Sequence, residues 1–447
     1  MAPGRLFGTD GVRGEAGTEL GVDLALRLGR AAASVLGVGP GRPSAVVGCD
    51  GRASGEMLEA AVVAGLAAQG VDVHRVGVLP TPAVARLTRD LGASFGVVLS
   101  ASHNPAEDNG IKLFGPGGTK LADAVEDRVE VAAEHVDDLP RLAGRAVGRA
   151  RDVADAAERY VAAVAATCPV DLAGLRVVVD CANGAASAVA PAAYRRAGAD
   201  VVAVADTPDG WNINDGVGST HVEHVAAAVR EHGADLGVAH DGDADRCLAV
   251  DAAGELVDGD QILALAALDA RERGRLPGGA VVTTVMTNLG FTRAMDAAGL
   301  RVVQTPVGDR YVLEAMHAQG LTVGGEQSGH VVLLDHATTG DGLVTALQVM
   351  ARVVSAGRPL AELAAVVQRL PQVLVNVRVT DRSVVDAPRV REAVDAARAE
   401  LGASGRVLLR PSGTEPLVRV MVEATEQQQA DDVAGRVADA VREAAGG

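Results

Sequence analysis

Short runs of β-branched residues alternate along this chain with alanine-rich stretches of helical length. The first group has strand-like runs at 45–48, 71–78 and 96–100, with helical stretches at 55–69 and 82–91 between them. Strands that alternate with helices of this length are typical of parallel sheets joined by crossover helices. The pattern therefore predicts an α/β fold.

The same order of segments occurs three times before the pattern changes. It returns at residues 175–179, 199–204 and 236–239, and again at 280–285, 300–303 and 321–324. Beyond about Pro371 a strand, a helix, two strands and a final helix follow one another. We therefore predict three consecutive α/β domains and a smaller C-terminal α+β domain, at residues 1–153, 154–254, 255–369 and 370–447.

The last strand of each α/β group runs into a loop dense with polar residues. These loops are residues 102–105, 241–246 and 326–330. In open α/β sheets, ligands bind beyond the carboxyl ends of the strands. We expect the three loops to surround one cleft.

Composition and charge narrow the class of ligand. The net charge of −17 argues against a general binder of nucleic acids or anionic membranes. Aromatic residues make up 2% of the chain, and Trp211 is the sole tryptophan, so base-stacking surfaces are scarce. An anionic ligand must therefore be bound by polar groups in a locally basic pocket.

The cysteines and the uncharged stretches bear on the location of the protein. Cys49, Cys168, Cys181 and Cys247 show no Cys-x-x-Cys spacing, which fits a reducing compartment. The beginning of the chain carries charges without an apolar run between them, unlike a signal peptide. The longest uncharged stretch, residues 276–292, contains three glycines and a proline and is too short to span a membrane. We predict a cytoplasmic protein.

Asp241, Asp243 and Asp245 alternate on a loop that contains glycine. Such a loop can turn three carboxylates toward one hard cation such as Mg²⁺ or Ca²⁺. An EF-hand is excluded, because its sixth position would be Arg246 instead of glycine and its twelfth Ala252 instead of glutamate. A solvated acidic turn remains the alternative to a metal site.

Ser102 follows an apolar strand and precedes His103, with Lys112 close behind. Adjacent serine and histidine residues rarely form a catalytic pair, so a polar turn is the alternative to a reactive site. A Gly-x-Ser-x-Gly match at residues 92–96 precedes a strand instead of joining strand to helix. A nucleophile elbow at Ser94 is therefore excluded.

Residues 410–416, with Arg419 beyond them, place two guanidinium groups, two hydroxyl groups and a glycine amide within ten residues. Arginine side chains and backbone N–H groups match the several acceptor oxygens of a phosphate. The segment predicts a phosphate site, and a tight turn with solvent-facing arginines is the alternative.

Taken together, these motifs resemble those of the α-D-phosphohexomutase superfamily, whose members have three α/β domains and a smaller fourth domain around a central cleft. The resemblance is carried by Phe-Gly-Thr-Asp-Gly-Val-Arg-Gly at 7–14, Ser-Ala-Ser-His-Asn-Pro at 100–105 and Asp-Asn-Gly-Ile-Lys at 108–112. The opening motif, Gln327 and the segment 333–336 are similar to the branch that acts on glucosamine phosphates.

The resemblance implies a set of site residues. It implies a phosphoserine at Ser102, and a Mg²⁺ ion held by its phosphate together with Asp241, Asp243 and Asp245. Sugar hydroxyl groups would contact Glu326 and Ser328, and Arg310 belongs to the same substrate-binding set. The phosphate that is not reacting would be held by Arg410, Ser412, Gly413, Thr414 and Arg419. Arg13 belongs to the catalytic set, and the candidate proton carriers, which the sequence does not rank, are Lys112, His103 and His330.

The implied reaction converts glucosamine 6-phosphate to glucosamine 1-phosphate through a 1,6-bisphosphate, which supplies UDP-N-acetylglucosamine and cell-wall synthesis. A hexose bisphosphate primer or a kinase would first phosphorylate Ser102. A homodimer is left open, and the net charge and the uncharged stretches indicate no nucleic-acid or membrane partner. The alternatives are a mutase for mannose or glucose phosphates, a non-catalytic phosphosugar sensor and a metal-dependent phosphatase.

Overall fold

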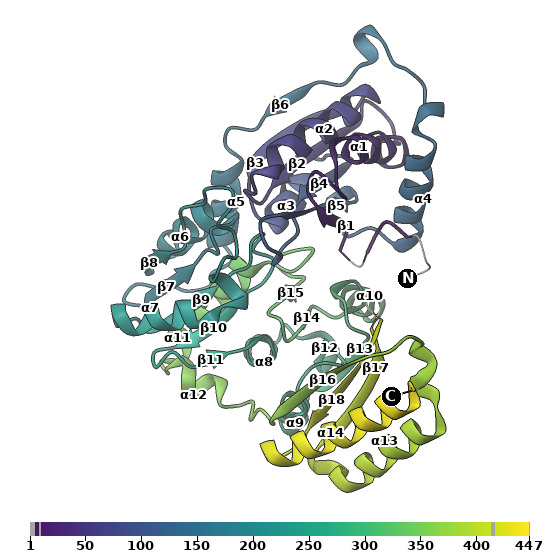
Figure 1. Ribbon diagram of the computed structural model, residues 1–447. Coiled ribbons are helices and arrows are strands. Elements are labelled where there is room, and N and C mark those ends of the chain that lie inside the picture. Colours follow the sequence, from purple (N-terminus) through teal and green to yellow (C-terminus); the bar gives the residue numbers. More distant parts are fainter. Residues whose placement is uncertain (1–4, 9, 413–415, 447) are drawn as a thin grey trace. The chain divides into compact units, whose positions relative to one another are not determined.

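The computed structural model describes residues 5–8, 10–412 and 416–446, which form two compact units. The larger unit contains residues 6–285 and 300–366, and the smaller unit contains residue 5, residues 286–299 and the described residues from 367 onward. Three sheets with their helices form the larger unit, and a fourth sheet belongs to the smaller one (Figure 1).

The first sheet has the strand order β1-β5-β4-β2-β3-β6. Its strands are β1 (Val12–Glu15), β2 (Ser44–Cys49), β3 (Asp72–Val78), β4 (Phe95–Leu99), β5 (Asp108–Phe114) and β6 (Ala150–Asp152). Strands β2, β3, β4 and β6 are parallel, whereas β5 runs antiparallel to β4 and β1. The helices are α1 (Val22–Leu36), α2 (Ser54–Ala68), α3 (Thr81–Asp90) and α4 (Asp123–Glu134). Helices α1 and α2 pack closely at Gly65. A Cβ atom at this position would lie 2.4 Å from the Leu26 carbonyl oxygen, so the close contact requires glycine.

The second and third sheets repeat the alternation of strands and helices. The second has the order β11-β10-β9-β7-β8, formed by β7 (Arg176–Asp180), β8 (Asp200–Val204), β9 (Leu236–Ala239), β10 (Leu248–Asp251) and β11 (Leu256–Val257), with α5 (Ala156–Ala165), α6 (Ala186–Arg196) and α7 (Val222–His232). The third has the order β13-β12-β14-β15, formed by β12 (Ala280–Thr284), β13 (Arg301–Thr305), β14 (Val323–Gly325) and β15 (Val331–Leu333), with α8 (Gly259–Glu272), α10 (Asp309–Gln319), α11 (Gly342–Ala356) and α12 (Leu360–Ala364).

Aspartate side chains cap the N-termini of two helices of the third group. Asp258 accepts a hydrogen bond from the Gln261 backbone, and the Gln261 side chain accepts one from Asp258 N–H, which forms a capping box at α8. Asp341 accepts hydrogen bonds from the backbone N–H groups of Leu343 and Val344, both at 3.0 Å, at the start of α11. These acidic caps explain why both helices begin where they do.

Each of the three sheets carries its polar loop on a tight β-loop-β connection. The loops lead from β4 to β5, from β9 to β10 and from β14 to β15, and each second strand is antiparallel to the first. The predicted loops therefore occupy equivalent places in three related sheets. The sequence pattern did not predict the returning strands, since it marked these segments only as polar loops.

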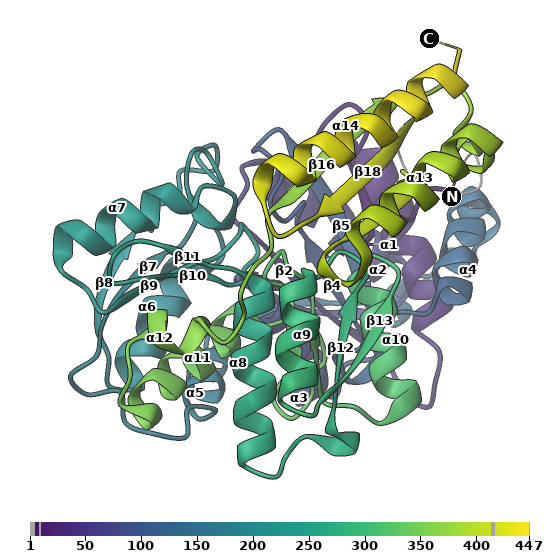
Figure 2. The same cartoon turned by 90° about the horizontal axis from the view of Figure 1, so that it is seen from below.

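The smaller unit is built on a three-stranded antiparallel sheet. The strand order is β16-β18-β17, formed by β16 (Gln372–Arg378), β17 (Arg406–Pro411) and β18 (Leu417–Glu423). Helices α13 (Pro388–Leu401) and α14 (Gln427–Ala444) run side by side against this sheet (Figure 2). Helix α9 (Leu289–Ala297) belongs to the same unit, and its Leu289 N–H donates to buried Glu423 Oε2 at 2.9 Å.

The predicted fold class is confirmed: three successive α/β groups precede a smaller α+β domain with an antiparallel sheet. The predicted domain boundaries stay a prediction. Among the described residues, no helix is long and apolar enough to cross a lipid bilayer.

Candidate active site

The loops of the first and second sheets meet at Ser102. The Ser102 hydroxyl group donates a hydrogen bond of 2.6 Å to Asp241 Oδ2, although the two residues are 139 positions apart. Ser102 is 1% exposed, and its backbone is left-handed, with φ at 55°. A serine rarely adopts this conformation, so the loop must hold it there.

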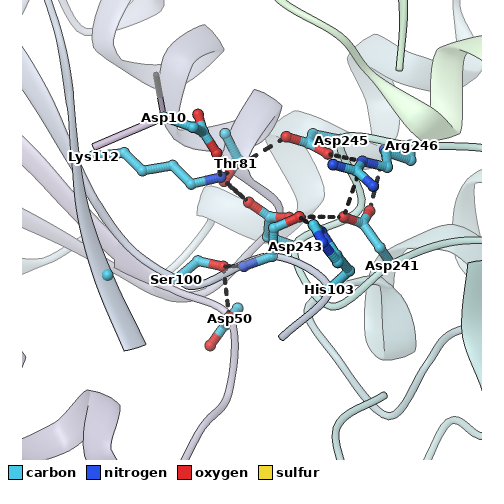
Figure 3. A network of polar contacts seen from close by, with 12 residues as sticks. Asp10, Asp50, Thr81, Ser100, His103, Lys112, Asp241, Asp243, Asp245 and Arg246 are labelled. Atoms are coloured by element: carbon cyan, nitrogen blue, oxygen red, sulfur yellow. Dashed lines mark hydrogen bonds and ion pairs between the residues drawn. The ribbon is translucent and has the colours of Figure 1, made fainter. Parts of the chain in front are cut away.

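The three predicted metal ligands converge in a buried position (Figure 3). One carboxylate oxygen from each of Asp241, Asp243 and Asp245 lies within 4.8 Å of the others. Among the described residues, Asp243 Oδ1 and Asp245 Oδ1 are buried without a hydrogen-bond partner. Buried carboxylate oxygens with unused acceptor capacity fit a divalent cation, and their burial argues against a solvated acidic turn.

The crowded carboxylates also perturb one another. Burial raises the pKa of Asp241 to about 8, and repulsion from Asp245 and Asp243 adds to the effect. Burial alone would raise the pKa of Asp245 as well, but His330 and Lys112 hold it far below its usual range. A bound cation would relieve the repulsion that the triplet creates.

Lys112 is the central cation of the site. Its Nζ atom lies 2.7 Å from Asp243 Oδ2 and 2.8 Å from Asp10 Oδ2. Burial would lower the pKa of Lys112, but the carboxylates of Asp10, Asp243 and Asp245 outweigh burial and raise it. Lys112 is therefore held as an ammonium ion. Arg13 also donates to Asp10, which brings two of the predicted catalytic side chains to this carboxylate.

The loop of the third sheet reaches the same cluster through His330. Its Nδ1 atom lies 3.6 Å from Asp245 Oδ2, and its Nε2 atom lies 3.5 Å from Asp309 Oδ2. Although burial would lower the pKa of His330, these carboxylates raise it to about 9. Gly340 packs on the ring, since a Cβ atom there would lie 2.4 Å from His330 Nε2.

His103 has the opposite electrostatic environment. Burial lowers its pKa to about 4, and the nearby charges of Arg246 and Arg13 contribute. Its Nδ1 atom lies 3.3 Å from the Ser102 hydroxyl oxygen. His103 is therefore a neutral imidazole beside the hydroxyl group, whereas Lys112 and His330 carry protons.

The predicted sugar-binding residues have different surroundings. Ser328 Oγ is buried without a hydrogen-bond partner among the described residues, and Glu326 Oε1 accepts from Gly308 N–H at 3.0 Å. Arg310 lies on α10 and donates to Glu126 Oε2 at 2.7 Å, with Asp123 as a second ionic partner. These contacts join α10 to α4, and a substrate-binding role for Arg310 stays a prediction.

In the smaller unit, the two predicted phosphate-binding arginines face each other on adjacent strands. Arg410 of β17 is directly paired with Arg419 of β18. Burial lowers the pKa of Arg410, and the charge of Arg419 lowers it further. Like charges opposite each other destabilise a strand pair unless an anion compensates them. Ser412 is buried beside them, whereas Gly413 and Thr414 lie outside the described residues.

Sequence reasoning missed several residues of the cluster. Lys120 bridges Asp10 and Asp309, and Thr81 Oγ1 donates to Asp243 Oδ2 at 2.5 Å. Asp10 stands inside the opening motif, so the motif was a signal for it. Asp309 and Lys120 offered no signal, because their contacts join segments that lie far apart in the sequence.

Comparison with known proteins identifies the family. Models of the phosphoglucomutase/phosphomannomutase α/β/α domains I, II and III match residues 4–139, 158–254 and 258–370, and the model of the C-terminal domain matches residues 374–440. A phosphoglucosamine mutase from Streptomyces griseus is 62% identical, over 99% of this chain and 100% of its own. The chain belongs to the phosphoglucosamine mutase family.

Solved structures extend the likeness to the fold of the wider superfamily. A phosphoglucomutase/phosphomannomutase family protein from Burkholderia thailandensis has a TM-score of 0.82 and 25% identity, over 99% of this chain and 98% of its own. An N-acetylphosphoglucosamine mutase from Aspergillus fumigatus, solved with GlcNAc-6P and magnesium, has a TM-score of 0.69 and 23% identity, over 99% and 97% of the two chains. The phosphoglucosamine mutase family belongs to the phosphohexomutases, so the chain is an isomerase.

Proposed function

We propose that the protein interconverts glucosamine 6-phosphate and glucosamine 1-phosphate through a phosphoserine at Ser102 and a glucosamine 1,6-bisphosphate. The observation that carries this proposal is the hydrogen bond of 2.6 Å between the Ser102 hydroxyl group and Asp241, which is a member of the buried aspartate triplet. The membership of the family supports the choice of substrate.

In the forward direction, phospho-Ser102 transfers its phosphoryl group to the free 1-hydroxyl group of glucosamine 6-phosphate. The bond between phosphorus and Ser102 Oγ breaks, a bond to the sugar oxygen forms, and the sugar hydroxyl group loses a proton. The Ser102 oxygen takes up a proton in its place. After the 1,6-bisphosphate has turned over, the bond between its 6-oxygen and phosphorus breaks and the phosphoryl group bonds to Ser102 Oγ. Ser102 gives up its proton, the 6-oxygen takes up a proton, and glucosamine 1-phosphate leaves. The two transfers balance, so a primer bisphosphate or a kinase is needed only to load Ser102.

The residues of the larger unit divide this work. Asp241, Asp243 and Asp245 would hold Mg²⁺, which, when bound, neutralises charge on the transferring phosphoryl oxygens. Lys112 is a fixed ammonium beside the triplet and adds positive charge there. His103 is neutral and adjoins the Ser102 oxygen, so it is placed to accept a proton. Glu326 and Ser328 would contact sugar hydroxyl groups.

The smaller unit would bind the phosphate that is not reacting. Arg410 and Arg419 present paired charges, and Ser412, Gly413 and Thr414 would add hydroxyl and backbone donors.

The four cysteines are free thiols, which supports a cytoplasmic enzyme.

A substrate panel with product analysis tests the proposal. The protein is loaded with glucose 1,6-bisphosphate and Mg²⁺ and then given glucosamine 6-phosphate, glucose 6-phosphate or mannose 6-phosphate. We expect the highest kcat/KM with glucosamine 6-phosphate and a mass increase of one phosphoryl group on Ser102. Preference for mannose or glucose phosphates would identify another mutase. Phosphate release without isomerisation would identify a phosphatase, and no turnover would favour a sensor.

Replacing Arg419 with alanine tests the site for the second phosphate. Loss of a charge-assisted contact typically costs about 1.5–3 kcal/mol, so kcat/KM should fall roughly ten- to a hundredfold. More bisphosphate should also escape before the second transfer, which quantification of released bisphosphate would detect. Arg436→Ala is the matched control, because Arg436 lies on α14 and pairs with Glu400. Unchanged kcat/KM and leakage in Arg419→Ala would mean that the arginines form an ordinary turn.

A further inference from the structure

We propose that Arg52 and Asn214 are positioning residues that clamp the backbone of the Ser102 loop from two sides. The inference rests on the proposed function, in which Ser102 carries the phosphoryl group. Both side chains donate to the carbonyl oxygens of Ser102 and Asn104. They act on the reaction through these carbonyls, by fixing the direction of the Ser102 hydroxyl group.

Arg52 forms the first side of the clamp. It follows β2, is 2% exposed, and donates to the carbonyl oxygens of Ser102 at 3.0 Å and Asn104 at 2.8 Å. The same guanidinium group donates to the Asp108 carbonyl oxygen at 2.9 Å and to that of Pro105. The planar guanidinium group therefore donates hydrogen bonds to backbone carbonyl oxygens along the whole turn from β4 to β5. A lysine ammonium group cannot make this set of contacts.

Asn214 forms the second side and comes from the second α/β group. Its Nδ2 atom donates to the carbonyl oxygens of Ser102 and Asn104, each at 2.9 Å. A carbonyl oxygen accepts two hydrogen bonds, so the two donors saturate each of these carbonyls. Gly242 leaves the space for this contact, since a Cβ atom there would lie 2.6 Å from the Ser102 carbonyl oxygen and 3.0 Å from Asn214 Nδ2.

Asp50 connects the clamp to the N–H group of Ser102. Asp50 Oδ2 accepts from Arg52 Nε at 2.9 Å and from the Ser100 hydroxyl group at 2.6 Å, and the latter contact is visible in Figure 3. The Ser100 oxygen in turn accepts from Ser102 N–H at 2.8 Å. Both the N–H and the C=O of Ser102 are thus fixed by buried side chains.

The conformation of Ser102 explains why such a clamp is needed. With φ at 55°, Ser102 occupies a region that residues with a side chain rarely adopt, so an unrestrained loop would leave it. In the clamped conformation the hydroxyl group points at Asp241. Phosphoryl transfer depends on alignment of the reacting atoms, and a displacement of about 1 Å can cost a hundredfold in rate.

The test measures transfer from phospho-Ser102 to glucosamine 6-phosphate in a single turnover, per phosphorylated serine counted by intact mass. In Arg52→Lys we expect this rate to fall roughly ten- to a hundredfold, with the Kd of glucosamine 6-phosphate changed by less than about twofold. Asn214→Ala should lower the rate about three- to tenfold, because Arg52 still occupies both carbonyls. Arg42→Lys is the matched control. Arg42 also pairs with an aspartate, Asp72, and donates to two backbone carbonyls, but these belong to residues 145 and 147.

The outcomes separate this inference from the proposed function. If wild type carries a transferable phosphoryl group and both clamp variants transfer it at the wild-type rate, the inference is overturned. A lower melting temperature without a lower rate per phosphoserine, or a loss confined to substrate affinity, would also overturn it. If Arg52→Lys does not fold, Asn214→Ala decides. A wild type that transfers nothing from Ser102 overturns the proposed function and the inference together.

Discussion

Replacing Ser102 with alanine is expected to lower isomerisation by at least about a thousandfold, because the covalent carrier of the phosphoryl group is removed. Without the hydroxyl group, the phosphoryl group of the primer has no acceptor in the protein. The fold should persist, since Ser102 lies on a loop whose carbonyl and N–H contacts remain available to alanine. Formation of glucosamine 1-phosphate in a coupled assay measures the loss, and intact mass should show no phosphorylation by the bisphosphate.

Ser94→Ala is the matched control for this experiment. Ser94 belongs to the Gly-x-Ser-x-Gly segment and stands just before β4, whereas Ser102 follows the same strand. Its substitution removes a hydroxyl group from the opposite end of the strand and should leave the rate and the phosphorylation unchanged. Near-normal activity in Ser102→Ala, or loss of activity in Ser94→Ala, would contradict the assignment of the nucleophile.

The fold class could be predicted because the strands and helices of each α/β group correspond to a local pattern of β-branched runs and alanine-rich stretches in the sequence. The returning strands β5, β10 and β15 could not, since each follows a polar loop and two of them have only three or four residues. Helix α9 shows a second limit. The order of elements places it after β12, yet its contacts with residues such as Glu423 bind it to the smaller unit.

The predicted metal site follows from local spacing, because alternate aspartates on one loop need only backbone turns to converge. The environment of Ser102 depends on partners from other elements, and no local pattern specifies them. Asn214 reaches Ser102 across 112 positions and Arg52 across 50. Arg310 shows the converse. An arginine side chain is suited to binding a phosphosugar, but Arg310 lies beside Glu126, which is 184 positions away in the sequence.

Substituting Asp243 with asparagine should reduce Mg²⁺-dependent activity by at least about tenfold, because one of three anionic ligands is lost at constant shape. Asp243 is the informative member of the triplet. Its Oδ2 atom contacts Lys112 and Thr81, while its buried Oδ1 atom has no hydrogen-bond partner among the described residues. That oxygen therefore has the acceptor capacity that a divalent cation would use.

The same variant has a readout that is independent of catalysis. A ligand that binds the folded chain alone raises its stability in proportion to ln(1 + [L]/Kd), so Mg²⁺ should raise the melting temperature of wild type. In Asp243→Asn the rise should begin at a Mg²⁺ concentration about tenfold higher. The starting melting temperature does not decide the question, because the substitution weakens both the repulsion among the carboxylates and the attraction to Lys112.

Asp235→Asn separates the loss of a ligand from the loss of a charge. Asp235 is exposed, belongs to the same α/β group and accepts from the Arg176 backbone at 2.7 Å. Its substitution changes the net charge by the same amount, so any general effect of charge on cation binding appears in both variants. A Mg²⁺ midpoint displaced only in Asp243→Asn places the cation at the triplet. Coincident Mg²⁺ titrations of wild type and Asp243→Asn, in activity and in melting temperature, would reduce the triplet to a buried acidic turn neutralised by Lys112.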